Sequence, residues 1–277
     1  MDVNGRTAVV TGAAGGIGGA LVRALLNAGA ESVVATDMLL DGVVALADSL
    51  HGDTARSASG GRVFPRALDV TDQAATEALV REVENTIGPI DLWFANAGMA
   101  TGGGPEAPDA TWNGQWEVNV MSHVYATRAL LPGWLARGEG YLITTASMAG
   151  LLTTLGDGVY ATTKHAAVGY AEWLAITYGD QGVRVSCVCP GAVDTNMLRS
   201  GAGGDALKAS AAIGGGEVLP PDEAAARILA GVAEDRFLIL THPELKTFIE
   251  RKAGDPERWI AGMRRLWKRT QDLLASS

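Results

Sequence analysis

Tyr160 and Lys164 are four positions apart in the segment Tyr160-Ala161-Thr162-Thr163-Lys164. If this segment is helical, the phenol and the ammonium lie on one face, because residues i and i+4 are neighbours on a helix. A free phenol has a pKa of about 10, and a fixed cation beside it favours the phenolate. Lowering that pKa by ~2–3 units requires ~3–4 kcal/mol of differential interaction. The pair is consistent with general acid–base chemistry, although the same spacing also arises by chance.

A glycine-rich stretch, TGAAGGIG (residues 11–18), lies between an apolar run and a helix-like segment. In that position the glycines allow a tight turn, and the helix N-terminus offers free N–H groups to a pyrophosphate. Asp37 follows Gly18 by 19 residues, where a carboxylate can accept hydrogen bonds from both hydroxyls of an adenosine ribose. It would repel a 2′-phosphate, and the neighbouring Gly15 and Met38 are not basic. The expected cofactor is therefore NAD rather than NADP.

Apolar runs alternate with helix-like segments along the chain, which predicts βαβ units and a parallel sheet. The predicted strands are Thr7–Thr11, Ser32–Thr36, Val63–Leu68, Ile90–Ala95, Gly140–Ala146, Val183–Cys189 and Phe237–Leu240. The predicted helices are Gly16–Ala28, Leu39–Leu50, Ala74–Thr86, a long helix capped by Asp109 and running to about Arg137, and Val159–Gly179. The expected fold is a Rossmann-type doubly wound α/β sheet of about seven strands with helices on both faces. With no internal repeat or linker, residues 1–277 are expected to form one domain.

Composition excludes several classes of function. The 277 residues carry a formal net charge of −9, which argues against a nucleic-acid partner or an anionic membrane surface. Two cysteines fit a reduced, intracellular protein better than a disulfide scaffold. No signal peptide or transmembrane run is recognised, so a cytoplasmic location is expected.

The last third of the chain contains a candidate lid and a basic tail. Residues 194–216, mostly small and glycine-rich, are the expected substrate lid. The extension of about residues 243–277 carries eight Lys/Arg and five Asp/Glu. Asp255-Pro256 predicts a helix start, and apolar residues follow at helical spacing: Trp259, Ile260, Met263, Leu266, Trp267, Thr270 and Leu273. The expected role is an amphipathic helix docked on its own protein or a sister subunit, with a membrane-surface helix as the alternative.

Seven motifs in order resemble the short-chain dehydrogenase/reductase family, in its single-domain, NAD-dependent branch. They are TGAAGGIG (11–18), LDV (68–70), NAG (96–98), VNV (118–120), Ser147, YATTK (160–164) and PG (190–191). The resemblance covers roughly residues 5–200 and is specific, because each motif also falls on the appropriate predicted element.

The resemblance implies a role for each matching residue. Tyr160 would be the acid/base at the substrate oxygen, and Ser147 would hold that oxygen. Lys164 would bind the nicotinamide ribose and depress the pKa of Tyr160, while Asn119 would kink its helix and anchor a water linking Lys164 to solvent. The remaining cofactor-binding residues would be Gly12, Gly16, Ile17 and Gly18 at the pyrophosphate, Asp37 at the ribose, Asp69 and Val70 at the adenine, and Asn96, Ala97, Gly98, Pro190, Gly191, Val193 and Thr195 beside the nicotinamide. The implied reaction is hydride transfer between a secondary alcohol, or its ketone, and the cofactor, without a metal.

The substrate is less well determined. The candidate pocket walls are apolar, which favours a hydrophobic or aromatic substrate: Met99, Met148, Leu151, Leu155, Ala192, Met197 and Leu198. Alternatives are an acyl-carrier-linked or xenobiotic ketoreductase, or a NAD-sensing protein without catalysis.

Other conspicuous residues favour packing roles. The four histidines lack metal-ligand spacing and are interpreted as surface or core residues. Cys187 and Cys189 share one face of a strand and are interpreted as packing, as are Trp112 and Trp116, which could alternatively contact a sister subunit. The resemblance implies a homotetramer, or a homodimer, built through the 109–137 and 159–179 helices.

Overall fold

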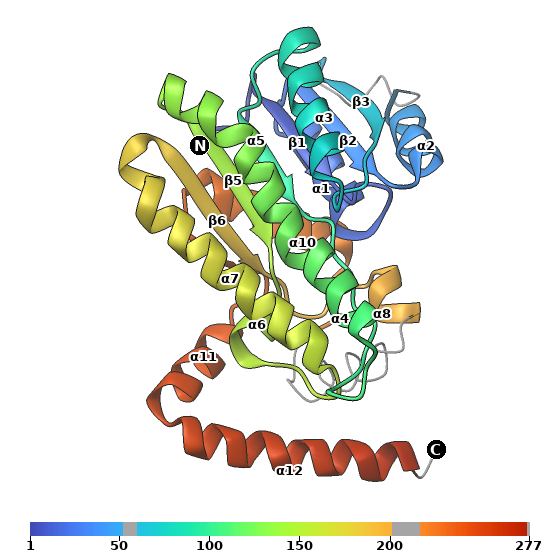
Figure 1. Ribbon diagram of the computed structural model, residues 1–277, viewed down its shortest axis with the longest axis vertical. Helices are drawn as coiled ribbons and strands as arrows, with labels where there is room; N and C mark the ends of the chain where they lie inside the picture. The colour runs from blue at the N-terminus through green and yellow to red at the C-terminus, as the bar shows by residue number, and fades with distance from the viewer. Residues whose placement is uncertain (52–59, 201–216, 276–277) are drawn as a thin grey trace.

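The computed structural model describes residues 1–51, 60–200 and 217–275 (Figure 1). Within these ranges seven strands form one parallel sheet in the order β3-β2-β1-β4-β5-β6-β7. The strands are β1 (Thr7–Thr11), β2 (Ser32–Asp37), β3 (Arg62–Ala67), β4 (Leu92–Ala95), β5 (Gly140–Thr145), β6 (Val183–Cys189) and β7 (Leu238–Leu240). This is the predicted Rossmann-type fold, and the strand boundaries differ from the predicted ones by at most two residues.

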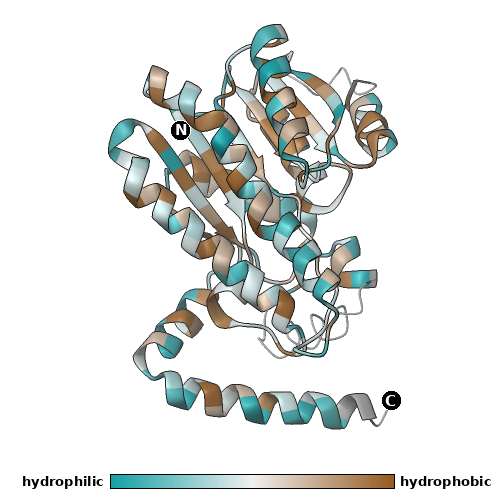
Figure 2. Cartoon of the chain, in the orientation of Figure 1, coloured by the Kyte–Doolittle hydropathy of each residue, from teal (hydrophilic) through white to brown (hydrophobic). Residues whose placement is uncertain are grey.

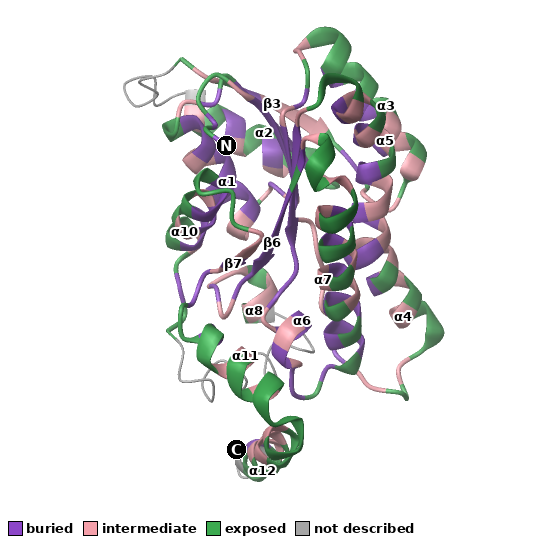
Figure 3. Ribbon diagram, turned by 90° about the vertical axis from the view of Figure 1, so that its left-hand side faces the viewer, coloured by how far each residue is buried: buried purple, intermediate pink, exposed green. Residues whose placement is uncertain are grey.

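Two layers of helices cover the sheet, and Figure 3 shows them edge-on, one layer on each side. One layer contains α1 (Gly16–Asn27), α2 (Leu40–His51) and α10 (Pro221–Ala233), and the other contains α3 (Gln73–Thr86), α5 (Ser122–Arg137) and α7 (Gly158–Tyr178). Because both faces are covered, neighbouring strand residues such as Val9 and Val10 are both fully buried, on opposite faces. This double burial explains the near-continuous apolar runs of the strands. Helix α10 is absent from the sequence-based prediction.

The long helix expected from Asp109 to Arg137 is interrupted. It consists of α4 (Asp109–Trp116), a π-helical turn, η1 (Glu117–Met121), and α5. Asn119 lies in the π turn, at the position where a kink was expected. The prediction that Asp109 caps the helix is wrong, because Pro108 holds the cap position and no side chain caps α4.

The strand order places a crevice at the carboxyl ends of the central strands. After β1 the chain builds outward through β2 and β3, then crosses back to place β4 on the other side of β1. Ligands of such open sheets bind at this reversal, beyond the carboxyl ends of the strands. The segments after β1, β4, β5 and β6 all leave the sheet at this edge, and they carry most of the predicted site residues.

The C-terminal segment forms two helices, α11 (Leu245–Gly254) and α12 (Pro256–Ala275). Helix α12 begins at Pro256, as Asp255-Pro256 predicts, and Figure 1 places it beyond α11, away from the sheet layers. Figure 2 shows apolar and polar residues alternating along it. Lys252 Nζ donates a hydrogen bond of 2.6 Å to the carbonyl oxygen of Leu151 in α6 (Ala149–Leu152), which ties α11 to the crevice side of the molecule.

Two further predictions concern the substrate lid and membrane-spanning helices. Helix α8 (Asn196–Ser200) occupies the start of the expected lid, whereas residues 201–216 lie outside the described residues, so the lid stays a prediction. Among the helices of the described ranges, none combines the length and apolar character required to cross a bilayer.

Candidate active site

A cavity of about 430 Å³ opens at the carboxyl edge of β1, β4, β5 and β6. It brings together residues that lie far apart in the sequence. The predicted residues that line it are Gly12, Gly16, Ile17, Asp37, Asn96, Ala97, Gly98, Ser147, Met148, Tyr160, Lys164, Pro190, Gly191, Ala192, Val193, Thr195, Met197 and Leu198.

The glycine-rich turn after β1 contains positions at which a side chain would strain the backbone or clash with a neighbouring segment. Gly12 (φ +67°) and Gly16 (φ +54°) adopt left-handed conformations that L-residues rarely occupy. A Cβ at Gly12 would lie 2.9 Å from Ala97 Cα, whereas one at Gly15 would meet no atom within 4 Å. Helix α1 begins at Gly16 with no side-chain cap, so its first N–H groups face the cavity with the positive end of the helix dipole. This arrangement fits the pyrophosphate of a dinucleotide.

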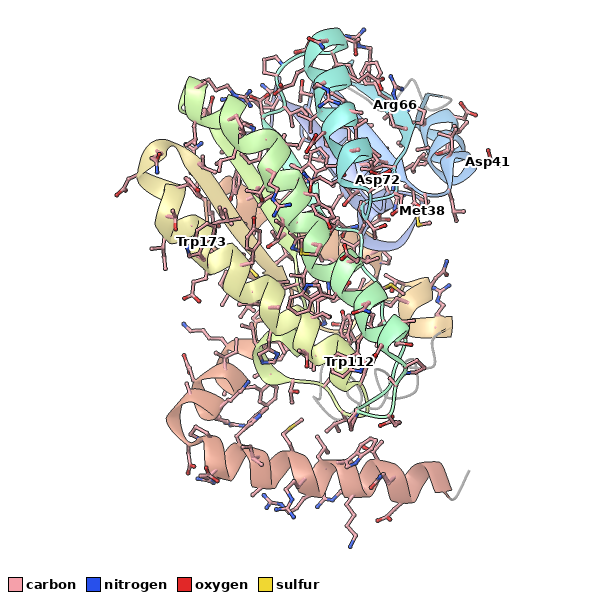
Figure 4. All side chains as sticks on the ribbon, viewed as in Figure 1. Met38, Asp41, Arg66, Asp72, Trp112 and Trp173 are labelled. Carbon is pink, nitrogen blue, oxygen red and sulfur yellow. The ribbon has the colours of Figure 1, made fainter. Side chains whose placement is uncertain are left out.

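Asp37 stands at the end of β2, at the other end of the same cavity. Its Oδ2 accepts a hydrogen bond from Ala14 N (3.1 Å) and its Oδ1 accepts one from Leu39 N (3.1 Å). These contacts fix the carboxylate while leaving lone pairs on both oxygens for a ligand. The adjacent Met38, labelled in Figure 4, is largely exposed and provides no positive charge.

Ser147, Tyr160 and Lys164 meet at the inner end of the cavity. Ser147 lies near enough to the Tyr160 hydroxyl to lower its pKa, and the Ser147 Oγ accepts a hydrogen bond from Ala149 N (3.1 Å). Lys164 Nζ lies 5.6 Å from the centre of the Tyr160 ring and donates to the carbonyl oxygen of Thr145 (3.0 Å). All three side chains are buried, so they can exchange protons with a bound molecule while bulk water is excluded.

Burial dominates the ionisation of this cluster. It raises the pKa of Tyr160 to about 12, whereas the neighbouring Ser147 hydroxyl acts to lower it. It lowers the pKa of Lys164 to about 8. The expected effect of Lys164 on the pKa of Tyr160 stays a prediction, because burial is the largest influence on the phenol in the protein alone.

Asn119 lies behind this cluster rather than in the cavity wall. Its Nδ2 donates to Met99 O (2.9 Å) and Thr163 Oγ1 (3.0 Å), and its Oδ1 accepts from Met99 N (3.0 Å). A Cβ at Gly98 would be 3.3 Å from both Asn119 Oδ1 and Lys164 Nζ, so Gly98 separates the two side chains. Asn119 thus anchors the segment after β4 against α7.

Comparisons with known proteins agree with this geometry. The profile of the short chain dehydrogenase family matches residues 6–203. The chain belongs to the short-chain dehydrogenase family.

Relatives of this short-chain dehydrogenase cover nearly its whole length. It is 35% identical over 268 residues to 1-deoxy-11-beta-hydroxypentalenate dehydrogenase of Streptomyces avermitilis, covering 94% of this chain and 93% of the relative. Among solved structures, a short-chain dehydrogenase/reductase from Burkholderia phymatum in complex with NAD superposes with a TM-score of 0.82 at 28% identity, covering 93% of this chain and 96% of the other. L-sorbose reductase from Gluconobacter frateurii, complexed with NADPH and L-sorbose, superposes with a TM-score of 0.73 at 27% identity, covering 87% and 97%. The enzyme is thus an oxidoreductase that uses a nicotinamide cofactor.

Several predicted residues of this dehydrogenase do not line the cavity among the described residues: Gly18, Asp69, Val70, Met99, Asn119, Leu151 and Leu155. Gly18 serves close packing, because a Cβ there would overlap the carbonyl oxygen of Gly12 and lie 2.8 Å from Asn96 Nδ2. Asp69 accepts hydrogen bonds from the backbone and hydroxyl of Thr71. Leu151 packs against the core beneath α7. Their proposed contacts with cofactor or substrate stay predictions.

Sequence reasoning missed two buried polar residues that contact residues of the cavity lining. Asp157 caps α7, and an acidic residue three positions before Tyr160 was a capping signal that could have found it. His242 follows β7 and packs against Gly191, whose N–H points at His242 Nδ1 (3.2 Å), while His242 Nε2 lies 2.9 Å from Glu217 O. Nothing in the local sequence marked His242, because its contact with Gly191 arises only from the pairing of β6 and β7.

Of the residues interpreted as packing, Cys187 and Cys189 are buried, whereas Trp116 is 41% exposed. Cys187 and Cys189 are buried free thiols with their Sγ atoms 3.9 Å apart. His123 is fully buried, and burial lowers its pKa to about 3 with a further effect from the charge of Lys164. Within the described ranges, no group of three or more His, Cys, Asp or Glu could hold a metal ion.

Proposed function

We propose that this protein is an NAD-dependent alcohol dehydrogenase/ketoreductase that acts on hydrophobic secondary alcohols or their ketones, with Tyr160 as acid/base. The observation that carries the proposal is the shared cavity. Ser147, Tyr160 and Lys164 line its inner end, and the glycine turn and Asp37 line the rest. One dinucleotide binding across these groups would leave its nicotinamide beside the Tyr160 hydroxyl.

The preference for NAD rests on Asp37. Its carboxylate would accept hydrogen bonds from the ribose hydroxyls, and it would repel the 2′-phosphate of NADP. Similar structures have been solved with NAD and with NADPH, so the family alone does not choose between them. The absence of a basic residue at Gly15 or Met38 supports NAD in this chain.

The chain's own residues account for the proton transfer. In ketone reduction, the Tyr160 hydroxyl donates its proton to the carbonyl oxygen, while the Ser147 hydroxyl hydrogen-bonds to that oxygen and orients it. In alcohol oxidation, the Tyr160 phenolate accepts the hydroxyl proton. Lys164 donates to Thr145 O and has two further N–H donors for the ribose hydroxyls and the charge of the phenolate. When bound, the nicotinamide supplies the hydride chemistry.

The apolar wall indicates the substrate class. Met148, Ala192, Met197 and Leu198 line the cavity and offer no partner to a charged substrate. The name of the Streptomyces avermitilis relative also implies a hydroxylated substrate. We propose a largely apolar, secondary alcohol or ketone, and we retain the acyl-carrier-linked ketoreductase as the alternative.

The association of two or four copies is a further part of the proposal. Trp173 and Ile176 on the outer face of α7 are 52% and 78% exposed, and Trp116 at the end of α4 is 41% exposed. Figure 4 labels Trp173 on this face. Burial of these side chains against a second copy would stabilise a homodimer or homotetramer. A cytoplasmic location likewise stays a prediction.

The test is a panel of apolar secondary alcohols and ketones assayed with NAD(H) and NADP(H), monitored by reduced-nicotinamide absorbance. We expect turnover with apolar members of the panel and a preference for NAD(H). Turnover restricted to acyl-carrier-linked ketones with NADPH would favour the alternative. Binding of NAD without turnover on any substrate would favour a sensing role.

A further inference from the structure

Asp157 is a buried carboxyl directly before the helix that carries Tyr160. Asp157 occupies the cap position of α7 and is 1% exposed. Its Oδ1 accepts a hydrogen bond from Tyr160 N (2.9 Å), and its Oδ2 accepts one from Gly102 N (3.0 Å). Both oxygens therefore act as acceptors, as those of an ionised carboxylate do.

Asp157 also joins two segments that border the cavity. Gly103 and Asp157 form a parallel bridge, and Gly158 N donates to Gly103 O (2.8 Å). The segment after β4 is therefore attached to the start of α7 through the residue that caps Tyr160. No ion pair given for the described part of the chain includes Asp157, so its negative charge is not neutralised by a neighbouring cation.

The groups facing the Tyr160 phenol come from the segment after β5, from β6 and from α7 itself. Ser147, after β5, and Cys189, from β6, both lie near enough to the phenol to influence its pKa. Lys164, on α7, lies beside the ring. The neighbouring Cys187 thiol and burial together raise the pKa of Cys189 well above its usual value, so this thiol is neutral. The charges acting on the phenol are thus Lys164, which favours the phenolate, and Asp157, which opposes it.

We propose that Asp157 is a positioning residue that orients Tyr160 and whose negative charge keeps the Tyr160 phenol protonated, extending to higher pH the range in which the enzyme reduces ketones. This inference rests on the proposed function, because it assigns Tyr160 the proton transfer. Burial and the charge of Asp157 both raise the pKa of Tyr160, which agrees with the direction required. An uncharged residue at position 157 removes one of these two effects.

The experiment compares wild type with Asp157→Asn and Asp157→Ser. Asparagine keeps the size of the side chain, and serine keeps a side-chain acceptor for the N–H of Tyr160, so at least one variant should retain the fold. Asp72→Asn is the matched control. Asp72, labelled in Figure 4, caps α3 by accepting a hydrogen bond from Ala75 N (3.0 Å) and lies outside the cavity lining.

Two readouts are measured for each protein. The first is the pH profile of kcat/KM for alcohol oxidation, whose acidic limb reports the ionisation of the free enzyme's essential base. The second is an NMR titration of ¹³C-labelled tyrosine, with Tyr160→Phe to assign the Tyr160 resonance. We expect the limb and the Tyr160 titration to move about 0.5–1 pH unit lower in both Asp157 variants and to stay unchanged in Asp72→Asn.

The outcomes separate this inference from the proposed function. Lower kcat at every pH, with both the limb and the resonance unmoved, would show that Asp157 is only a helix cap and overturn the inference. Absence of turnover in all proteins, together with a shifted Tyr160 titration, would overturn the proposed function and leave the electrostatic role of Asp157 standing.

Discussion

At the scale of single residues, the site places a weak acid where it cannot ionise easily. Tyr160 is buried, and its pKa of about 12 makes it a proton donor at neutral pH. The sequence identified Tyr160 and Lys164 from their spacing together with the family resemblance of the surrounding motifs. It could not reveal the sign of the pKa shift, because burial depends on residues from β5, β6 and the segment after β4.

Tyr160→Phe removes the proposed proton donor and keeps the ring. We expect kcat/KM to fall by at least about 10²-fold, because positioned proton transfer contributes about 10²–10⁴. The affinity for NADH, measured by fluorescence titration, should remain within about threefold of wild type. Substantial turnover by Tyr160→Phe would contradict the assigned role.

Asp37→Ser tests the cofactor preference. Removal of the carboxylate takes away hydrogen bonds to the ribose and the repulsion of a 2′-phosphate, each worth on the order of 1–2 kcal/mol. We expect the ratio of kcat/KM for NADH over NADPH to fall by about tenfold or more. Asp41, on α2 and outside the cavity lining, provides the control substitution Asp41→Ser. An unchanged ratio in Asp37→Ser would show that other residues select the cofactor.

At the scale of secondary-structure elements, the sequence predicted the strands, which follow from local apolar patterns. It missed contacts that depend on how the strands pair. The apolar runs located the strands because both faces of the sheet are buried. Hydrophobic periodicity did not indicate the π turn at Asn119, which was expected only as a kink implied by the family resemblance. Helix α10 was missed although Pro221 and the following acidic residues form a helix-start pattern. The packing of His242 on Gly191 requires the register between β6 and β7.

The turn between β1 and α1 offers a test with a matched control. Gly18→Ala would force a Cβ against the carbonyl oxygen of Gly12, which the rigid turn cannot easily relieve. We expect the free energy of unfolding to fall by about 1–3 kcal/mol, the usual cost of overpacking. Gly15→Ala adds the same methyl group to extended backbone with no atom within 4 Å, and its stability should be unchanged. Equal stabilities of the two variants in urea denaturation would contradict this account.

At the scale of the whole molecule, a buried ionisable group near the site also affects the free energy of unfolding. His123 on α5 is fully buried, and neither ring nitrogen has a hydrogen-bond partner among the described residues. The imidazole is therefore folded in its neutral form, close enough to Lys164 for that charge to oppose its protonation. The helix that supports Asn119 thus contains a group that acid must charge before or during unfolding.

This linkage predicts how stability depends on pH. The pKa of His123 is about 3 in the folded protein and about 6.5 in the unfolded chain, so between these values the unfolded state binds more protons. The contribution of His123 is complete above about pH 6.5 and is lost as the pH falls toward 3, by up to about 1.4 kcal/mol per pH unit. Urea denaturation of wild type and His123→Leu between pH 7 and 4.5 measures it. The difference in unfolding free energy should move in favour of His123→Leu as the pH falls. A constant difference for His123→Leu would mean that His123 takes up protons as readily in the folded protein as in the unfolded chain.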